Sequence, residues 1–147
     1  MAQVTSHEGR IIRGDSGGQR FVSVDSAAND SDKTLTVPVG QFWVIQTLFV
    51  TFATSADVGN RQIVVVVSDG TNTLGIFNAD STQAGSTTEY YTFSPNYGSA
   101  TETPATFHYA PLPVYSLDAG STIRVYDSAT VAAAADDMTL VLYGHTY

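Results

Sequence analysis

The chain has 147 residues, of which 43% are hydrophobic and 14% charged, a composition typical of one globular domain rather than of a disordered segment. Fourteen acidic residues against six basic ones give a formal net charge of −8. This balance excludes nucleic acid and an anionic membrane surface as expected partners, because both require clustered cations. No cysteine is present, which excludes disulfides, zinc–thiolate sites and thiol nucleophiles.

The first twenty residues differ in composition from the rest. Residues 1–20 are polar and rich in glycine, and Ile11 and Ile12 are their only strong apolar pair. We therefore expect an N-terminal arm over 1–20 and a β-sandwich domain over 21–147. A polar arm is ordered when something ties it down, so we expect Ile11 and Ile12 to anchor it on a neighbouring subunit.

From residue 20 onward, short β-prone runs alternate with turn residues, and no segment has the periodicity of an amphipathic helix. Asp69–Asn72 indicates a hairpin turn, because Gly and Asn tolerate positive φ. Residues 129–137 fit either a helical turn, because of their alanines, or a small-residue loop. The spacing predicts an all-β fold, a single jelly-roll-like β-sandwich of about eight strands. The eight runs are 20–24, 34–37, 41–56, 61–68, 74–78, 88–94, 122–127 and 138–143, and 106–109 and 112–117 are short edge pieces beside them.

The run over 41–56 is apolar in both phases of a strand. Side chains alternate between the two faces of a strand, and the even positions predict the core side: Phe42, Val44, Leu48, Val50 and Phe52. Trp43, Ile45 and Phe49 fall on the opposite side, where an isolated sandwich normally shows polar residues to water. We therefore expect a second chain, or the arm, to cover these three side chains.

A second candidate contact is the aromatic region over residues 90–109, where the sequence predicts interface roles for Tyr91, Tyr97 and Tyr109. Exposed tyrosines anchor protein interfaces, and they also stack on sugar rings. Both interpretations stay open, and the intersubunit contact is the preferred one.

Two short motifs suggest chemistry that the chain cannot support. Gly14–Gly18 matches the nucleophile signature of trypsin-like proteases, but only thirteen residues precede it and His7 is their one histidine. No scaffold for a base and its orienting carboxylate fits there. No other serine, histidine and carboxylate are placed by strand pattern to act together, so we expect no catalytic residues. Arg13–Asp15 spells the integrin tripeptide, for which chance in a glycine-rich arm is a sufficient explanation.

Metal ligands are equally sparse. Asp25–Asp32 is the best calcium candidate, since it has oxygen ligands at short spacing, but it lacks the EF-hand pattern. His7, His108 and His145 are scattered along the chain, which does not suit a facial metal site. We predict no metal site and no cofactor.

Three segments of the chain resemble virion proteins of tailed bacteriophages. These segments are Thr36–Val44 (TVPVGQFWV), Ser116–Asp127 (SLDAGSTIRVYD) and Ala135–Leu142 (ADDMTLVL). In those proteins a V-P-x-G-x-x-W motif at the start of a strand precedes a late L-x-A-G-S-x-I-R-V-Y-D hairpin. The resemblance extends from Thr36 onward and leaves the first twenty residues out.

The resemblance implies a small β-sandwich head protein of the decoration or cement type, usually trimeric, on the capsid exterior. Its partners would be the major capsid protein and copies of itself, and the family offers no catalytic residues to carry over. We therefore expect a non-enzymatic protein that stabilises the phage head through apolar intersubunit contacts. The alternative is a head or tail appendage that binds a host-surface glycan through its tyrosine loops.

Overall fold

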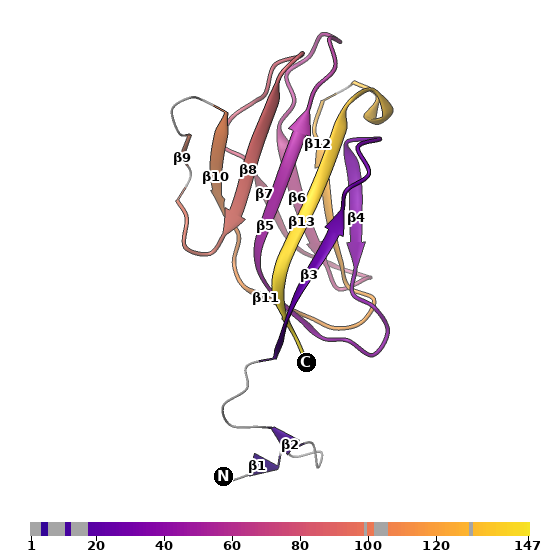
Figure 1. The fold of residues 1–147 in the computed structure, drawn as a ribbon, viewed down its shortest axis with the longest axis vertical. Helices are drawn as coiled ribbons and strands as arrows, with labels where there is room; N and C mark the ends of the chain where they lie inside the picture. The colour runs from indigo at the N-terminus through magenta and orange to yellow at the C-terminus, as the bar shows by residue number, and fades with distance from the viewer. Residues whose placement is uncertain (1–3, 6–10, 13–17, 99, 102–105, 130) are drawn as a thin grey trace.

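The computed structural model describes residues 4–5, 11–12, 18–98, 100–101, 106–129 and 131–147 and shows two β-sheets packed face to face (Figure 1). The larger sheet has the strand order β3 (Gln19–Asp25), β13 (Asp137–Thr146), β5 (Trp43–Ala53), β8 (Thr88–Ser94), β10 (Phe107–Pro111) and β9 (Ala100–Thr101), with β11 (Tyr115–Leu117) also paired to β5. The smaller sheet has the order β4 (Asp32–Thr36), β12 (Thr122–Asp127), β6 (Ile63–Ser68) and β7 (Thr73–Asn78). β1 (Val4–Thr5) and β2 (Ile11–Ile12) pair with each other in a separate small sheet.

The connectivity is that of a jelly roll. Leaving aside β1 and β2 and the short strands β9, β10 and β11, the strands follow the chain order β3, β4, β5, β6, β7, β8, β12, β13. One sheet then holds the first, eighth, third and sixth of these strands, and the other holds the second, seventh, fourth and fifth. This is the double Greek-key arrangement of a jelly roll. The expected all-β, jelly-roll-like sandwich is confirmed.

Local sequence signals account for several boundaries. β8 and β12 begin and end where the sequence predicts, and the turn between β6 and β7 is the expected hairpin. In that turn Gly70 has φ +95°, and the Asp69 carboxylate accepts the amide hydrogens of Thr71 and Asn72. Residues 129–137 include a short 3₁₀ turn, Ala133–Ala135. β3 begins at Gln19, so the sandwich starts two residues before the expected boundary.

A β-bulge in β5 corrects the expected alternation of that strand. Tyr143 pairs with Thr47, but Gly144 pairs with Ile45, so Gln46 is an extra residue without a partner on β13. A bulge reverses the phase of side chains, and Trp43 and Ile45 therefore point into the same core as the even positions after it. At Gly144 the strands approach so closely that a Cβ would collide with the Val44 carbonyl oxygen.

The prediction that Trp43 and Ile45 lie opposite the core is therefore wrong. Both are buried within their own sandwich, and the ring of Phe21 stacks on Trp43 with centroids 4.4 Å apart. Val44, expected in the core, is only half-buried. Phe49, which follows the bulge, lies on the outer side as predicted.

The core lies between the two sheets. The inward side chains of both sheets form one cluster, and β6 is buried on both faces at Val64 and Val65. Each large apolar side chain moved from water into such a core contributes roughly 1.5–3 kcal/mol. The inner faces alone thus supply a hydrophobic core for this fold. Within the described residues, no helix is long and apolar enough to cross a membrane.

Candidate functional site

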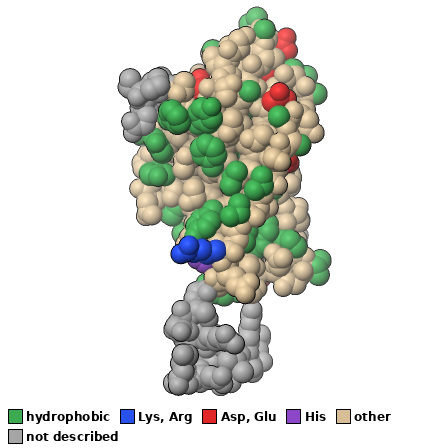
Figure 2. All heavy atoms as spheres, viewed as in Figure 1, with side chains coloured by type: hydrophobic (Ala, Val, Ile, Leu, Met, Phe, Trp, Pro, Cys, Tyr) green, Lys and Arg blue, Asp and Glu red, His purple; other side chains and the backbone are tan. Residues whose placement is uncertain are grey.

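The outer surface of the larger sheet is apolar across five strands. Strand register places Val24, Val141, Phe49, Thr92 and Tyr109 in one row from β3 to β10. The neighbouring rows add Val22 and Tyr143 on one side and Tyr90 and Phe107 on the other. Figure 2 shows hydrophobic side chains gathered over this sheet. We call this set the apolar face: Val22, Val24, Phe49, Tyr90, Phe107, Tyr109, Val141 and Tyr143.

Side chains of the apolar face remain in contact with solvent. Val22 is 61% exposed, Val24 53%, Phe107 42% and Val141 37%. The aromatic members stack on one another: the Tyr90 ring lies 6.2 Å from that of Phe49 and 5.2 Å from that of Phe107. A contiguous exposed apolar surface is typical of a contact with another molecule, whereas scattered single residues are not.

Among the described residues, acidic and basic side chains (Asp, Glu, Lys, Arg and His) lie only at the two ends of the apolar face. Arg20 and His145 face each other across β3 and β13 where β13 ends, and Asp137 is exposed where β13 begins. Among the described side chains in the rows between these ends, none is charged. The face can therefore be dehydrated without stripping water from an ion.

The structure separates the predicted interface residues into three groups. Phe49 and Tyr109 belong to the apolar face, and Tyr97 is 42% exposed beside it, with its ring 4.9 Å from that of Tyr109. Tyr91 is 1% exposed and belongs to the core, as do Trp43 and Ile45. The backbone of Ile11 and Ile12 forms β2, and their side chains lie outside the described part of the chain.

The sequence reasoning missed the valines of the apolar face. Val22 and Val24 on β3, and Val141 on β13, occupy the phase opposite to the core residues of their strands. The signal for them is an apolar residue in both phases of one strand, the same signal that residues 41–56 carry. To recognise one surface from the outward valines of β3 and β13, one must also know that these two strands are neighbours in the sheet.

A buried polar network supports the edge of the apolar face. His108 lies between two partners, with Nδ1 2.9 Å from Ser81 Oγ and Nε2 2.6 Å from Glu89 Oε2. Tyr91 stacks on the His108 ring and donates its hydroxyl hydrogen to Gln83 Oε1 at 3.0 Å. Burial, reinforced by the nearby Glu89 carboxylate, raises the pKa of the Tyr91 hydroxyl far above its usual value, so Tyr91 stays a neutral donor.

This network corrects the expectation that no serine, histidine and carboxylate would come together. In serine hydrolases the serine faces Nε2 and the carboxylate faces Nδ1, whereas Ser81 and Glu89 occupy the reverse positions around His108. His108 is 4% exposed beneath Tyr91. The contacts join β10 to β8 and to the segment after β7, and so hold in place the strand that carries Phe107 and Tyr109.

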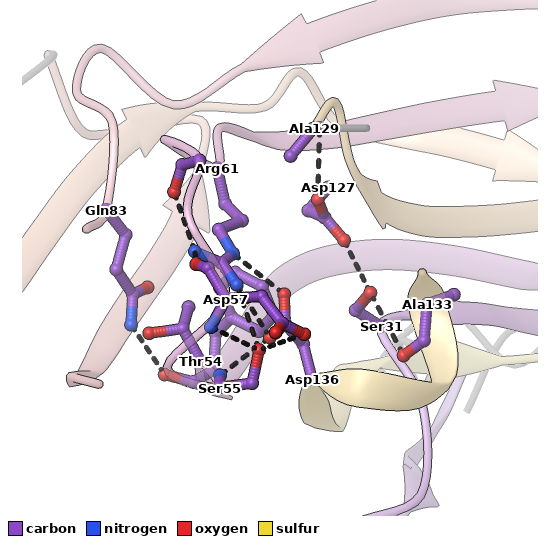
Figure 3. Close-up of polar contacts among 12 residues, drawn as sticks. Ser31, Thr54, Ser55, Asp57, Arg61, Gln83, Asp127, Ala129, Ala133 and Asp136 are labelled. Carbon is purple, nitrogen blue, oxygen red and sulfur yellow. Dashed lines mark hydrogen bonds and ion pairs between the residues drawn. The ribbon is translucent and has the colours of Figure 1, made fainter. Parts of the chain in front are cut away.

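A second polar cluster closes the end of the sandwich where β13 begins (Figure 3). Arg61 and Asp136 are both fully buried, with Arg61 Nε donating to Asp136 Oδ2 at 2.9 Å and Nη2 to Oδ1 at 3.1 Å. The Ser55 amide also donates to Asp136, at 2.7 Å. Burial would raise the pKa of Asp136, but the hydrogen bonds from Arg61 and Ser55 outweigh it and hold the pKa below its usual value. All these partners belong to the chain itself, so the cluster is a structural one.

The calcium candidate over residues 25–32 encloses a lysine. Lys33 is 4% exposed, and its ammonium donates to the Ala27 carbonyl at 2.6 Å and to Asp25 Oδ1 at 3.4 Å. The Asn29 side-chain oxygen is a further acceptor. A cation of the protein thus already holds the oxygens that a calcium ion would need. Across the described residues, no group of three or more His, Cys, Asp or Glu side chains could hold a metal ion.

The sequence matches no protein-family model and no curated protein. Among solved structures, the chain is similar to structures of infectious bursal disease virus, Gx strain and Gt strain, each at 14% identity over 99% of this chain. The TM-scores are 0.36 and 0.31, and the chain spans 38% and 42% of the length of those proteins. Scores below 0.5 do not establish a shared fold.

Proposed function

We propose that this chain is a non-enzymatic virion structural protein of the decoration or cement type, acting on the capsid exterior of a tailed bacteriophage. The observation that carries the proposal is the apolar face, a wide hydrophobic surface that the sandwich does not need for its own core. The phage-like segments from Thr36 onward support the same proposal. Jelly rolls occur in viral capsid domains and in lectin domains. Because one fold hosts many functions, the fold alone does not distinguish a capsid role from a lectin role, and the proposal depends on the apolar face.

The proposed mechanism is mechanical. Covering the apolar face removes large side chains from water, which stabilises a subunit contact by roughly 25 cal/mol per Å² of apolar surface. The rigid stack of Phe49, Tyr90 and Phe107 loses little side-chain entropy when it is covered, because neighbouring rings already restrict it. Contacts of this kind, made by copies of this protein with one another and with the major capsid protein, would link neighbouring capsomers and resist their separation.

A glycan-binding appendage is the second candidate. Tyr97 and Tyr109 form an exposed aromatic pair beside the apolar face, and such rings stack on sugars. A glycan site would depend on these two rings alone, whereas an assembly contact would depend on the whole face. Replacing Tyr97 by Ala should abolish glycan binding in the first case and leave head binding nearly unchanged in the second.

The test compares head binding by two matched variants. Val24 and Ile76 are both exposed apolar residues on strands at a sheet edge, but Val24 lies on the apolar face and Ile76 on the outer side of the smaller sheet. Purified protein is added to phage heads produced without it, and bound protein and the temperature of head disruption are measured. Wild type and Ile76→Asp should bind and raise that temperature, and Val24→Asp should do neither. Equal binding by all three proteins would contradict the proposal.

A further inference from the structure

The two ends of the apolar face differ in charge. Arg20 and His145 lie at the end where β3 begins, with two carboxylates, Asp69 and Asp118, in the turns of that end, and Asp137 lies at the other. The Asp137 end is strongly acidic, and the cations nearest to it, Lys33 on β4, Arg61 before β6 and Arg124 on β12, each pair with a carboxylate of that end. The carboxylates at this end are Asp25, Asp30, Asp32, Asp57, Asp80, Glu89, Asp127, Asp136 and Asp137.

This charge pattern limits how two copies of the chain could meet. Two faces packed with like ends together would bring two acidic ends side by side, and like charges oppose association. Packed end for end, the acidic ends lie at opposite extremes of the pair. Each Arg20 then lies near the Asp137 end of the other copy, and only the uncharged rows meet in the middle.

We propose that the apolar face is covered by a second copy of this chain, with the two larger sheets packed face to face, end for end, about a twofold axis near Phe49 and Val141. The inference rests on the proposed function, which makes this face an assembly contact, and it puts a pair in place of the trimer that the resemblance to phage decoration proteins implies. A twofold contact is self-complementary: with the axis along the row of Val24, Val141, Phe49 and Tyr109, this row in one copy meets the same row in the other, strand for strand.

The dimensions of the face suit such a pair. Five strands spaced about 4.8 Å apart, with about seven residues each rising about 3.4 Å, cover a patch more than 20 Å on each side. With its side-chain relief, such a patch approaches the roughly 800 Å² per partner of a standard interface. Threonines at 51, 92 and 139 lie between the larger rings, so the surface has hollows as well as projections. Side chains of two packed sheets interdigitate in this way across about 10 Å.

A paired protein would also explain how decoration stabilises a shell. If each copy of a pair binds a different capsomer through another part of its surface, the apolar contact between the copies becomes the link between capsomers, and Val24→Asp weakens head binding because it breaks the pair and leaves each copy a single attachment. Each copy of the pair then contributes one attachment to the shell. Because the two copies are tethered to each other, the second attachment forms at a high effective concentration, which strengthens the link.

Sedimentation equilibrium of the full chain tests the pairing. Wild type should sediment with twice the 15.6 kDa mass of the chain. Val24→Asp and Val141→Asp should each weaken the dimer more than a hundredfold, because each places two carboxylates in a dehydrated contact. Ile76→Asp should leave it unchanged. Circular dichroism checks that each variant is folded, and Val22→Asp replaces either variant that is not.

Charge reversal tests the end-for-end arrangement. Arg20→Asp and Asp137→Arg should each weaken the dimer, on the order of tenfold for two exposed pairs, and the two changes together should restore it. If the variant that carries both changes dimerised no more tightly than the single variants, the end-for-end arrangement would be overturned. A monomer at all concentrations, or a trimer disrupted by Val24→Asp, would overturn the twofold pair.

The outcome is separable from that of the proposed function. A monomer that still binds heads, and loses this binding on Val24→Asp, would reject the pair and retain the decoration role. A stable dimer that never binds heads would retain the pair and reject the decoration role.

Discussion

The outer sides of the two sheets differ in the residue at their centre. On the larger sheet Phe49 lies in a row of apolar and threonine side chains. On the smaller sheet the corresponding row is Ile76, Val66, Arg124 and Thr34, and Arg124 pairs with Asp32 and lies 4.5 Å from the centre of the Tyr126 ring. Both sheets contribute apolar inner faces to one core. The contrast indicates that the jelly roll does not require an apolar outer face, which supports the proposal that a partner covers it.

The largest expected effect is on the free energy of unfolding, which should depend on the buried pair Arg61–Asp136 and not on the apolar face. Arg61→Met removes the buried partner of Asp136 and leaves an uncompensated carboxylate, which should lower the free energy of unfolding by roughly 3–5 kcal/mol. Val24→Asp, at an exposed position, should change it by about 0.5 kcal/mol or less. Urea unfolding of monomeric samples measures both values. A larger loss for Val24→Asp than for Arg61→Met would mean that the face holds the fold and not a partner.

Acid should act on the same buried pair. Because the pKa of Asp136 is lower in the folded protein than its usual 3.8, its contribution to stability is complete above that value and is lost as the pH falls through the folded pKa. We expect a loss on the order of 1–3 kcal/mol from this hydrogen-bonded carboxylate. Unfolding curves from pH 6 down to pH 2 should show the fall in wild type and a flatter profile in Asp136→Asn. Identical pH profiles for wild type and Asp136→Asn would contradict the assignment of this acid-sensitive stability to the Asp136 carboxylate.

The smallest expected effect is on the outer side of the smaller sheet. Arg124 is exposed, and its hydrogen bonds to Asp32 lower the pKa of that carboxyl against the opposing influence of burial. Exposed ion pairs contribute little, so Arg124→Ala should lower the free energy of unfolding by about 1 kcal/mol or less. It should leave sedimentation and head binding unchanged. A loss of either property would place a partner on the smaller sheet and remove the contrast between the two sides.

The sequence predicted the elements whose ends are marked by local chemistry. β8 and β12 begin and end as expected, and the Asp69–Asn72 turn forms through its own side-chain hydrogen bonds. The position of Phe49 followed from alternation alone. These features depend on residues close together in the chain.

The features that the sequence did not predict depend on strand partners far away in the chain. The bulge that turns Trp43 and Ile45 into the core arises where β5 meets Gly144 of β13. The contact of His108 with Glu89 requires the parallel pairing of β10 with β8. Likewise, the valines of β3 and β13 form a surface only because these strands are neighbours. A single sequence gives no register for such pairs.

The most direct test of the central claim is a cryo-electron microscopy map of the assembled head in which side chains are visible. The claim predicts that Val24, Phe49, Tyr109 and Val141 lie within van der Waals distance, about 4 Å, of another chain, while Arg124 and Ile76 remain exposed to solvent. A map in which the outer side of the larger sheet faces solvent, and the smaller sheet makes the contacts, would contradict the claim.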